Sequence, residues 1–389
     1  MNETHYLASK QRFDILDGLR GVAALVVVGF HLFETYSKGP QYQILNHGYL
    51  AVDFFFLLSG YVMGYAYDDR WNKMSMKDFF KRRIVRLHPM VIAGSIIGAL
   101  LFYVGSSASF PLIDQTPWWK MLLVMLVTFT MIPILPKFDI RGWGETNPLN
   151  GPAWTLLYEY IANILYAVFI RRFSKTVLTL FVIFAAFLTI NLGMNLDVFG
   201  VLQDRNNPMY TTAYTFIGGW NIDIPGMLVG FTRLLYPFLM GLLLSRLKKV
   251  VKVKSAFSLC SFVIFILLVM PHLGGQDFMW INGLYDVICI LIIFPFIVTV
   301  GAGSEVTGKA QKICKFVGEI SYPLFITHYP LVYIQMAWKA NHPDAPLSQI
   351  ICVSVGLLIV AIGNAYALMK LYDAPVREWL KQHWLMKKA

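Results

Sequence analysis

Long apolar segments recur along the whole chain, and they constrain its fold more than any other feature. Most are close to the ~20 residues that a helix needs to cross the hydrocarbon core of a bilayer. Only 14% of the 389 residues are charged, whereas soluble domains have about 25% charged residues. The sequence therefore predicts an all-α, polytopic transmembrane helix bundle. The eleven apolar segments are 20–36, 49–67, 90–105, 118–136, 153–170, 176–194, 226–246, 256–272, 279–301, 315–338 and 349–371.

Lys and Arg gather in some loops between these segments and are sparse in the others. The basic stretches are Lys73–Arg86, Arg171–Lys175, Arg246–Lys254, Lys309–Lys315 and Arg377–Lys388. Because basic loops stay in the cytoplasm, both termini are expected to be cytoplasmic. Three apolar segments separate the first two basic stretches, so one of 90–105 and 118–136 is expected not to span. About ten spanning helices remain, in a multi-pass protein of the cell membrane.

Other features favour a single integral membrane domain over residues 1–389. The first 19 residues lack an apolar run, so we expect no cleavable signal peptide. The net charge of +11 lies in the loops and is explained by membrane orientation, so no nucleic-acid partner is predicted. The four cysteines (Cys260, Cys289, Cys314 and Cys352) stand far apart without a CxxC pair. They predict neither a disulfide framework nor a zinc site, and no metal site is expected.

Ionisable residues inside the first apolar helix are candidates for a functional site, because each is costly to place in lipid. Arg20 and His31 are eleven residues apart, which is about 20° beyond three helical turns, so both side chains lie on one face about 16.5 Å apart. A neutral histidine at this depth can accept a proton near pH 7. The alternative is a histidine that only hydrogen-bonds to a neighbouring helix. Asp17 lies one turn before Arg20.

A basic run follows the second apolar helix. Arg82, Arg83 and Arg86 are spaced to cluster on one helical side, and Pro89 is expected to end that turn or to begin the next helix. The cluster is either a positive-inside anchor or a clamp for a phosphate group, because arginine binds phosphate in a bidentate fork. No Walker motif or GxGxxG accompanies it, so neither ATP nor NAD is indicated.

Three further segments place polar groups at membrane depth. Asp53 lies at the start of the second helix, and Ser59-Gly60 permits close helix contact. Thr155, Glu159 and Asn163 form one polar stripe, in which Glu159 either binds a ligand or makes an interhelical hydrogen bond. Ser321 and His328 share a face but are about 10.5 Å apart, too far to be a nucleophile–base pair.

Together these residues resemble the acyltransferase-3 family of integral membrane acyltransferases. The matching segments are Asp17-Gly18-Leu19-Arg20-Gly21 with His31 (its Arg-x10-His signature), Asp53 to Gly60, Arg82 to Pro89, Trp154-Thr155-Leu156-Leu157-Tyr158-Glu159, Arg233 to Gly241, Ser321-Tyr322 to His328-Tyr329-Pro330, and Asp373-Ala374-Pro375. Two of them depart from the family pattern, with Thr155 in place of Ser and Asp373 in place of Glu. The resemblance covers residues 13–380, and the order of the motifs makes it specific.

The resemblance implies transfer of an acyl group, usually acetyl, from cytoplasmic acyl-CoA to a hydroxyl of a carbohydrate or glycan. Acyl-CoA would be a co-substrate, and no permanently bound cofactor is implied. The family is common in bacterial cytoplasmic membranes. Many relatives have an appended SGNH-type domain, which we do not expect in this chain.

The resemblance and the residues together suggest roles for the site. Arg82, Arg83 and Arg86 would bind the CoA phosphates together with Arg20, and His31 would be the general base. Glu159 would either orient His31 or bind the sugar. Supporting roles are expected for Asp17, Asp53, Ser59, Trp154, Thr155, Ser321, Tyr322 and His328. The main alternative is a transporter or flippase for a glycan or small polar solute, although no inverted repeat is evident.

Overall fold

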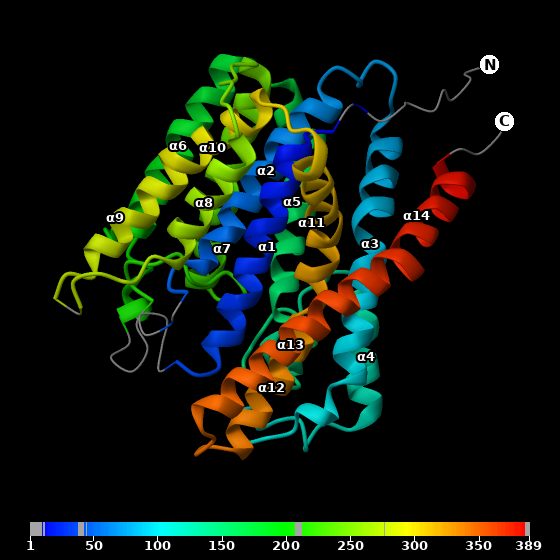
Figure 1. Cartoon of the computed structure of the whole chain (residues 1–389), viewed down its shortest axis with the longest axis vertical. Coiled ribbons are helices and arrows are strands. Elements are labelled where there is room, and N and C mark those ends of the chain that lie inside the picture. The colour runs from blue at the N-terminus through cyan, green and yellow to red at the C-terminus, as the bar shows by residue number, and fades with distance from the viewer. Residues whose placement is uncertain are drawn as a thin grey trace.

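The structure, a computed structural model, describes residues 10, 12–37, 43, 45–206, 212–275 and 277–385. All regular elements in these ranges are helices, gathered in one bundle (Figure 1), which confirms the all-helical fold class. The α-helices are α1 (Asp14–Glu34), α2 (Ala51–Tyr67), α3 (Met76–Leu100), α4 (Trp118–Phe129), α5 (Trp154–Val168), α6 (Lys175–Gly193), α7 (Ile224–Leu247), α8 (Ala256–Val269), α9 (Trp280–Ile288), α10 (Phe294–Gly303), α11 (Gly308–Thr327), α12 (Tyr329–Asn341), α13 (Leu347–Leu368) and α14 (Ala374–Leu380).

Seven helical segments in the described residues are long and apolar enough to cross a membrane. Their outward-facing sides are apolar, and Leu180, Phe296 and Ile359 are among the exposed side chains. The chain is therefore a multi-pass membrane protein. The seven are Asp14–Glu34, Gly48–Tyr67, Met76–Leu100, Lys175–Gly193, Ile224–Leu247, Trp280–Gly303 and Leu347–Leu385; the last crosses the bundle obliquely (Figure 1).

The region between α2 and α5 differs from the expected pattern. The basic run and the segment 90–105 form one helix, α3, which continues through Pro89. The expectation that Pro89 ends or begins a helix is thus wrong, because a helix packed in a membrane bundle tolerates the lost backbone hydrogen bond. In place of the segment 118–136, α4 has only 12 residues, a length of about 18 Å, and it is not among the seven candidate spans.

The apolar segment 315–338 is two helices rather than one. The first, α11, ends at Thr327, and α12 begins at Tyr329, with His328 between them. Pro330 lies in the first turn of α12, where its missing N–H donor costs nothing. The break places His328 and Tyr329 at the level of the end of α1, where both rings contact His31.

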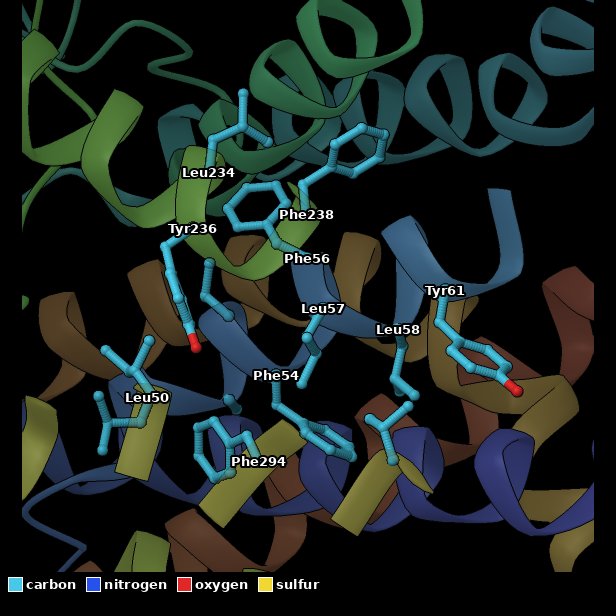
Figure 2. Packing of buried hydrophobic residues seen from close by; sticks show 14 of the residues in the cluster. Leu50, Phe54, Phe56, Leu57, Leu58, Tyr61, Leu234, Tyr236, Phe238 and Phe294 are labelled. Carbon is cyan, nitrogen blue, oxygen red and sulfur yellow. The ribbon is translucent and has the colours of Figure 1, made fainter. Parts of the chain in front are cut away.

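Close helix packing rests on glycines at two crossings. A Cβ atom on Gly60 of α2 would lie 2.0 Å from the carbonyl oxygen of Phe238 on α7, and one on Gly21 of α1 would lie 2.5 Å from the backbone of Val317 on α11. Around the first crossing, Phe56 of α2 lies beside Leu234 and Phe238 of α7, and Phe54 points to the other side of α2, against Phe294 (Figure 2). These contacts hold α1, α2, α7 and α11 as the centre of the bundle.

The basic loops meet at one end of the bundle. Arg246, at the end of α7, donates to Asp68 after α2 and to the carbonyl oxygens of Ile170 and Phe173 after α5. The beginning of α1 and the end of α14 lie at this same end (Figure 1). We call this the basic end of the bundle. The other end, where α1 terminates, is called the opposite end.

Candidate active site

A cavity of about 520 Å³ opens at the opposite end of the bundle. Helices α1, α2, α5, α7, α11 and α12 contribute side chains to its wall, together with the loop between α4 and α5. A space of this size accommodates a small molecule or one end of a longer one. Its polar and aromatic lining residues include His31, Glu34, Gln43, Tyr49, Ser109, Trp143, Glu145, Trp154, Thr155, Trp220, Arg233, Tyr329 and Lys339.

His31 lies in the wall of this cavity with its ring held on three sides. Its Nδ1 is 2.9 Å from Oε2 of Glu34, one turn later on α1. The ring stacks on His328, with centroids 5.3 Å apart, and meets the Tyr329 ring edge-on at 4.8 Å. Because a carboxylate only accepts hydrogen bonds, the Nδ1–H group of His31 donates a hydrogen bond to Glu34. In this tautomer, Nε2 has no proton and can accept one from a ligand.

Three tryptophans give the cavity flat apolar faces. Trp154 begins α5, Trp143 lies in the loop before it, and Trp220 precedes α7. Thr155 also lines the cavity, although its hydroxyl is donated to the carbonyl oxygen of Pro152. Aromatic faces combined with a few polar groups suit a ring with one apolar face and several hydroxyls. The predicted residues Trp154 and Thr155 thus lie in one cavity with His31.

Arg20 lies nearer the basic end, on the same side of α1 as His31. Its Nε donates to Oγ of Ser321 at 2.8 Å, its Nη2 donates to the carbonyl oxygen of Gly318, and Asp17 is 3.0 Å away. The neighbouring Tyr322 donates instead to the carbonyl oxygen of Leu87 on α3. α1 and α11 therefore run parallel, with Arg20 facing Ser321 and His31 facing His328.

The arginines of α3 face different surroundings. Arg83 is buried, donating to Oε1 of Glu159 at 2.5 Å and to Oδ1 of Asn163 at 3.0 Å. Arg86 is exposed and lies near Arg20 and Asp17. Arg82 is half-buried. An open arginine surface at the basic end can hold an anion, and Arg83 supports it from within the bundle.

Glu159 has its hydrogen-bond partners on α2 and α3, away from His31. Its carboxylate accepts from Arg83 and from the hydroxyl of Ser59, at 2.7 Å. In the described part of the chain it is not among the residues that line the cavity. Glu159 therefore links α2, α3 and α5, and neither of the two roles expected for it is seen as a direct contact.

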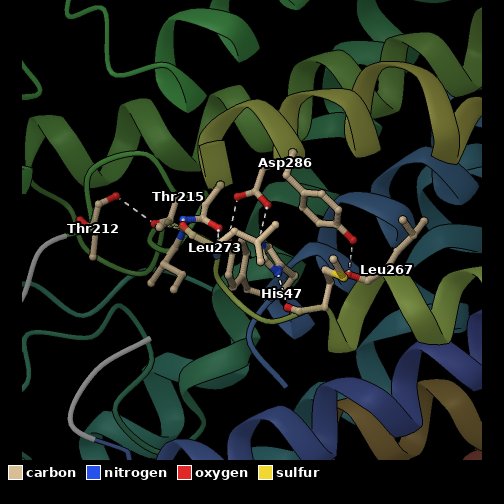
Figure 3. Close-up of polar contacts among 11 residues, drawn as sticks. His47, Thr212, Thr215, Leu267, Leu273 and Asp286 are labelled. Atoms are coloured by element: carbon tan, nitrogen blue, oxygen red, sulfur yellow. Dashed lines mark hydrogen bonds and ion pairs between the residues drawn. The ribbon is translucent and has the colours of Figure 1, made fainter. Parts of the chain in front are cut away.

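Asp53 belongs to a buried polar network behind the cavity wall. Arg233 donates to both carboxylate oxygens of Asp53, at 3.3 and 2.8 Å. Arg233 also donates to the carbonyl oxygen of Tyr49, whose hydroxyl is donated to Asp286. Next to this carboxylate, Nδ1 of His47 bonds the carbonyl oxygen of Met270 (Figure 3). The network neutralises Arg233 and fixes one wall of the cavity.

Comparison with known proteins places these motifs in a family. The sequence profile of the acyltransferase-3 family, described as an acyltransferase domain, matches residues 13–366. The chain belongs to the acyltransferase-3 family. It is 24% identical over 350 residues to peptidoglycan O-acetyltransferase OatA of Listeria monocytogenes. The aligned region covers 83% of this chain and 50% of OatA.

Two further relatives extend this picture. O-acetyltransferase OatA of Staphylococcus aureus is 24% identical over 342 residues, 82% of this chain and 50% of that protein. Protein 2 in the picA locus of Rhizobium radiobacter is 30% identical over 167 residues, 40% of this chain and 82% of that protein. The chain thus spans about half the length of its OatA relatives. No solved structure matches it.

The family profile confirms the predicted acyltransferase-3 resemblance. The cavity adds residues to which the sequence analysis gave no role. Glu34 follows His31 by one helical turn, and this spacing alone was a signal for a carboxylate–histidine pair. Glu145 and Trp220 lie in irregular segments without periodicity, so only the folded chain brings them to the cavity.

Proposed function

We propose that the chain is a membrane O-acyltransferase that moves an acyl group, acetyl in the simplest case, from acyl-CoA at the basic end to a hydroxyl of a carbohydrate acceptor in the cavity. The observation that supports this most strongly is His31, held by Glu34 in the wall of an aromatic cavity. The O-acetyltransferase names of the OatA relatives favour the same reaction.

In the proposed reaction, Nε2 of His31 takes the proton of the acceptor hydroxyl as its oxygen attacks the thioester carbonyl carbon. The C–S bond then breaks, and the leaving CoA thiolate takes the proton back from His31. Glu34 keeps the ring in the tautomer that this step needs, as a carboxylate does for histidine in hydrolase triads. Products are the O-acylated acceptor and free CoA.

The donor would enter from the basic end, which we place in the cytoplasm. Arg86, Arg82 and Arg20 would hold the CoA phosphates, and the pantetheine arm would run along α1 toward His31, a rise of about 16.5 Å. In this arrangement the chain crosses the membrane about ten times, with α4 as a re-entrant segment and α11–α12 as one traverse. Both termini would then be cytoplasmic, in a bacterial cytoplasmic membrane.

The proposal is tested by thiol release from acetyl-CoA in purified protein supplied with cell-surface glycans. We expect free CoA and acetylated glycan from the wild type, and a ~10²–10⁴-fold slower rate in His31→Ala, the usual contribution of a general base. Binding of acetyl-CoA should persist in this variant, since His31 is distant from the arginines. Full activity in His31→Ala, or glycan uptake into vesicles without CoA release, would overturn the proposal, and the second result would favour a transporter.

A further inference from the structure

A second carboxyl group, that of Glu145, lies in the wall of the cavity. Glu145 belongs to the irregular segment between α4 and α5, and its residue is only 5% exposed. Nothing in the reaction described above uses it. A buried carboxyl group is costly unless its oxygens have partners, so its position calls for a functional reason.

The segment that carries Glu145 is held rigidly. The carboxylate of Asp139 accepts from the backbone N–H groups of Arg141, Gly142 and Gly144, at 2.8 to 2.9 Å. The buried guanidinium of Arg141 packs 3.7 Å over the ring centre of Tyr333. A carboxyl group on such a frame is oriented before any ligand binds, which is a property of binding sites.

The hydrogen bonds of Glu145 leave one of its oxygens for a ligand. The hydroxyl of Tyr333 accepts from the backbone N–H of Gly151, so its own proton is donated to Oε2 of Glu145, at 2.6 Å. The other oxygen, Oε1, accepts no hydrogen bond from the described residues. It lies beside Gly151, also in the cavity wall, where a Cβ atom would approach Oε1 to 2.6 Å.

We propose that Oε1 of Glu145 binds a hydroxyl group of the carbohydrate acceptor and so selects acceptors that present a hydroxyl there. This inference rests on the proposed function, because it takes the cavity as the acceptor site. Glu145 would bind a hydroxyl other than the reacting one, which belongs to His31. Trp143, two residues earlier, would cover the sugar ring.

Acceptor binding should then depend on pH. Burial raises the pKa of Glu145 to about 7; Tyr333 and Arg141 oppose this rise, and Asp139 and Glu34 add to it. These are the charged and titratable groups that face it from its own loop, α1 and α12. Above this pKa the carboxylate makes a stronger, charge-assisted hydrogen bond to a neutral acceptor. The acceptor KM of the wild type should therefore fall as pH rises through 7.

The experiment compares Glu145→Gln with the wild type, using neutral glycans and their mono-deoxy analogues with acetyl-CoA. We expect the acceptor KM of the variant to rise roughly 10- to 100-fold, as for a lost hydrogen bond to a charged group. The KM for acetyl-CoA should stay unchanged. The acceptor KM of the variant should no longer fall as the pH rises through 7. One deoxy analogue should bind the wild type weakly and show no further loss with the variant. Asp114→Asn, an exposed carboxylate near the same end, is the matched control.

An unchanged acceptor KM in folded Glu145→Gln, with His31→Ala still inactive, would overturn the role of Glu145 and leave the proposed function standing. If neither variant loses activity, the proposed function fails as well. Should Glu145→Gln not fold, Tyr333→Phe replaces it, because this change frees the carboxyl from its fixed orientation. A smaller rise in acceptor KM is then expected, and no rise would overturn the inference.

Discussion

Arg83 and Arg86 are three residues apart on α3, yet their surroundings assign them different roles. Arg83 is enclosed by Glu159 and Asn163, whereas Arg86 is exposed beside Arg20. The Arg86 side chain is exposed at the protein surface, and the Arg83 side chain is not. Arg83 thus holds α3 against α5, and we propose that Arg86 binds the donor.

Substitution should separate the two roles. Arg86→Gln is expected to raise the KM for acyl-CoA roughly tenfold or more, as for loss of a charge-assisted bond, with unchanged thermal stability. Arg83→Gln leaves Glu159 buried without its cation, which costs about 3–5 kcal/mol when one partner of a buried pair is lost. Steady-state kinetics and thermal unfolding of both variants check this. Equal effects on acyl-CoA KM without loss of stability would contradict the assignment.

The sequence could predict which polar side chains lie inside the bundle, but not their partners. The spacing of Arg20 and His31 placed both on one face of α1, and both do contact the α11–α12 segment. Glu159 could be recognised as a buried carboxylate, but its partners Arg83 and Ser59 lie 76 and 100 residues away. Contacts of this range depend on helix packing, which one sequence does not show.

Helix boundaries depend on packing as much as on hydropathy. Pro89 lies inside α3 and Pro323 inside α11, whereas the break between α11 and α12 falls at His328. The hydropathy pattern located the apolar segments but not these ends, because a proline interrupts a helix only where no neighbour compensates. In the proposed topology, the short helix α4 would be the one of three apolar segments between two basic loops that does not span.

The crossing of α2 and α7 gives a test at this scale. A Cβ atom on Gly60 would lie 2.0 Å from the carbonyl oxygen of Phe238, so Gly60→Ala must push the helices apart. We expect a loss of about 1–3 kcal/mol or more from this overpacking, measured by thermal unfolding in detergent. Gly356→Ala on α13 is the matched control, because a Cβ atom added at Gly356 would meet no neighbouring atom within 4 Å. This variant should unfold like the wild type. Equal stability of both variants would contradict the close crossing.

The two ends of the molecule differ in the side chains they present. Exposed arginine and basic loops lie at one end, and the aromatic cavity with His31 and Glu145 lies at the other. Such a division suits a reaction whose two substrates approach from opposite faces of a membrane. In the proposed topology of about ten traverses, both termini would lie on the donor side.

Sidedness of transfer tests this account most directly. Proteoliposomes would contain the carbohydrate acceptor inside, with acetyl-labelled acetyl-CoA added only outside, and His31→Ala protein as the control. The account predicts label on the enclosed acceptor and free CoA outside for the wild type, with neither for the variant. Acetylation only when acceptor and acetyl-CoA share one side of the membrane would contradict it.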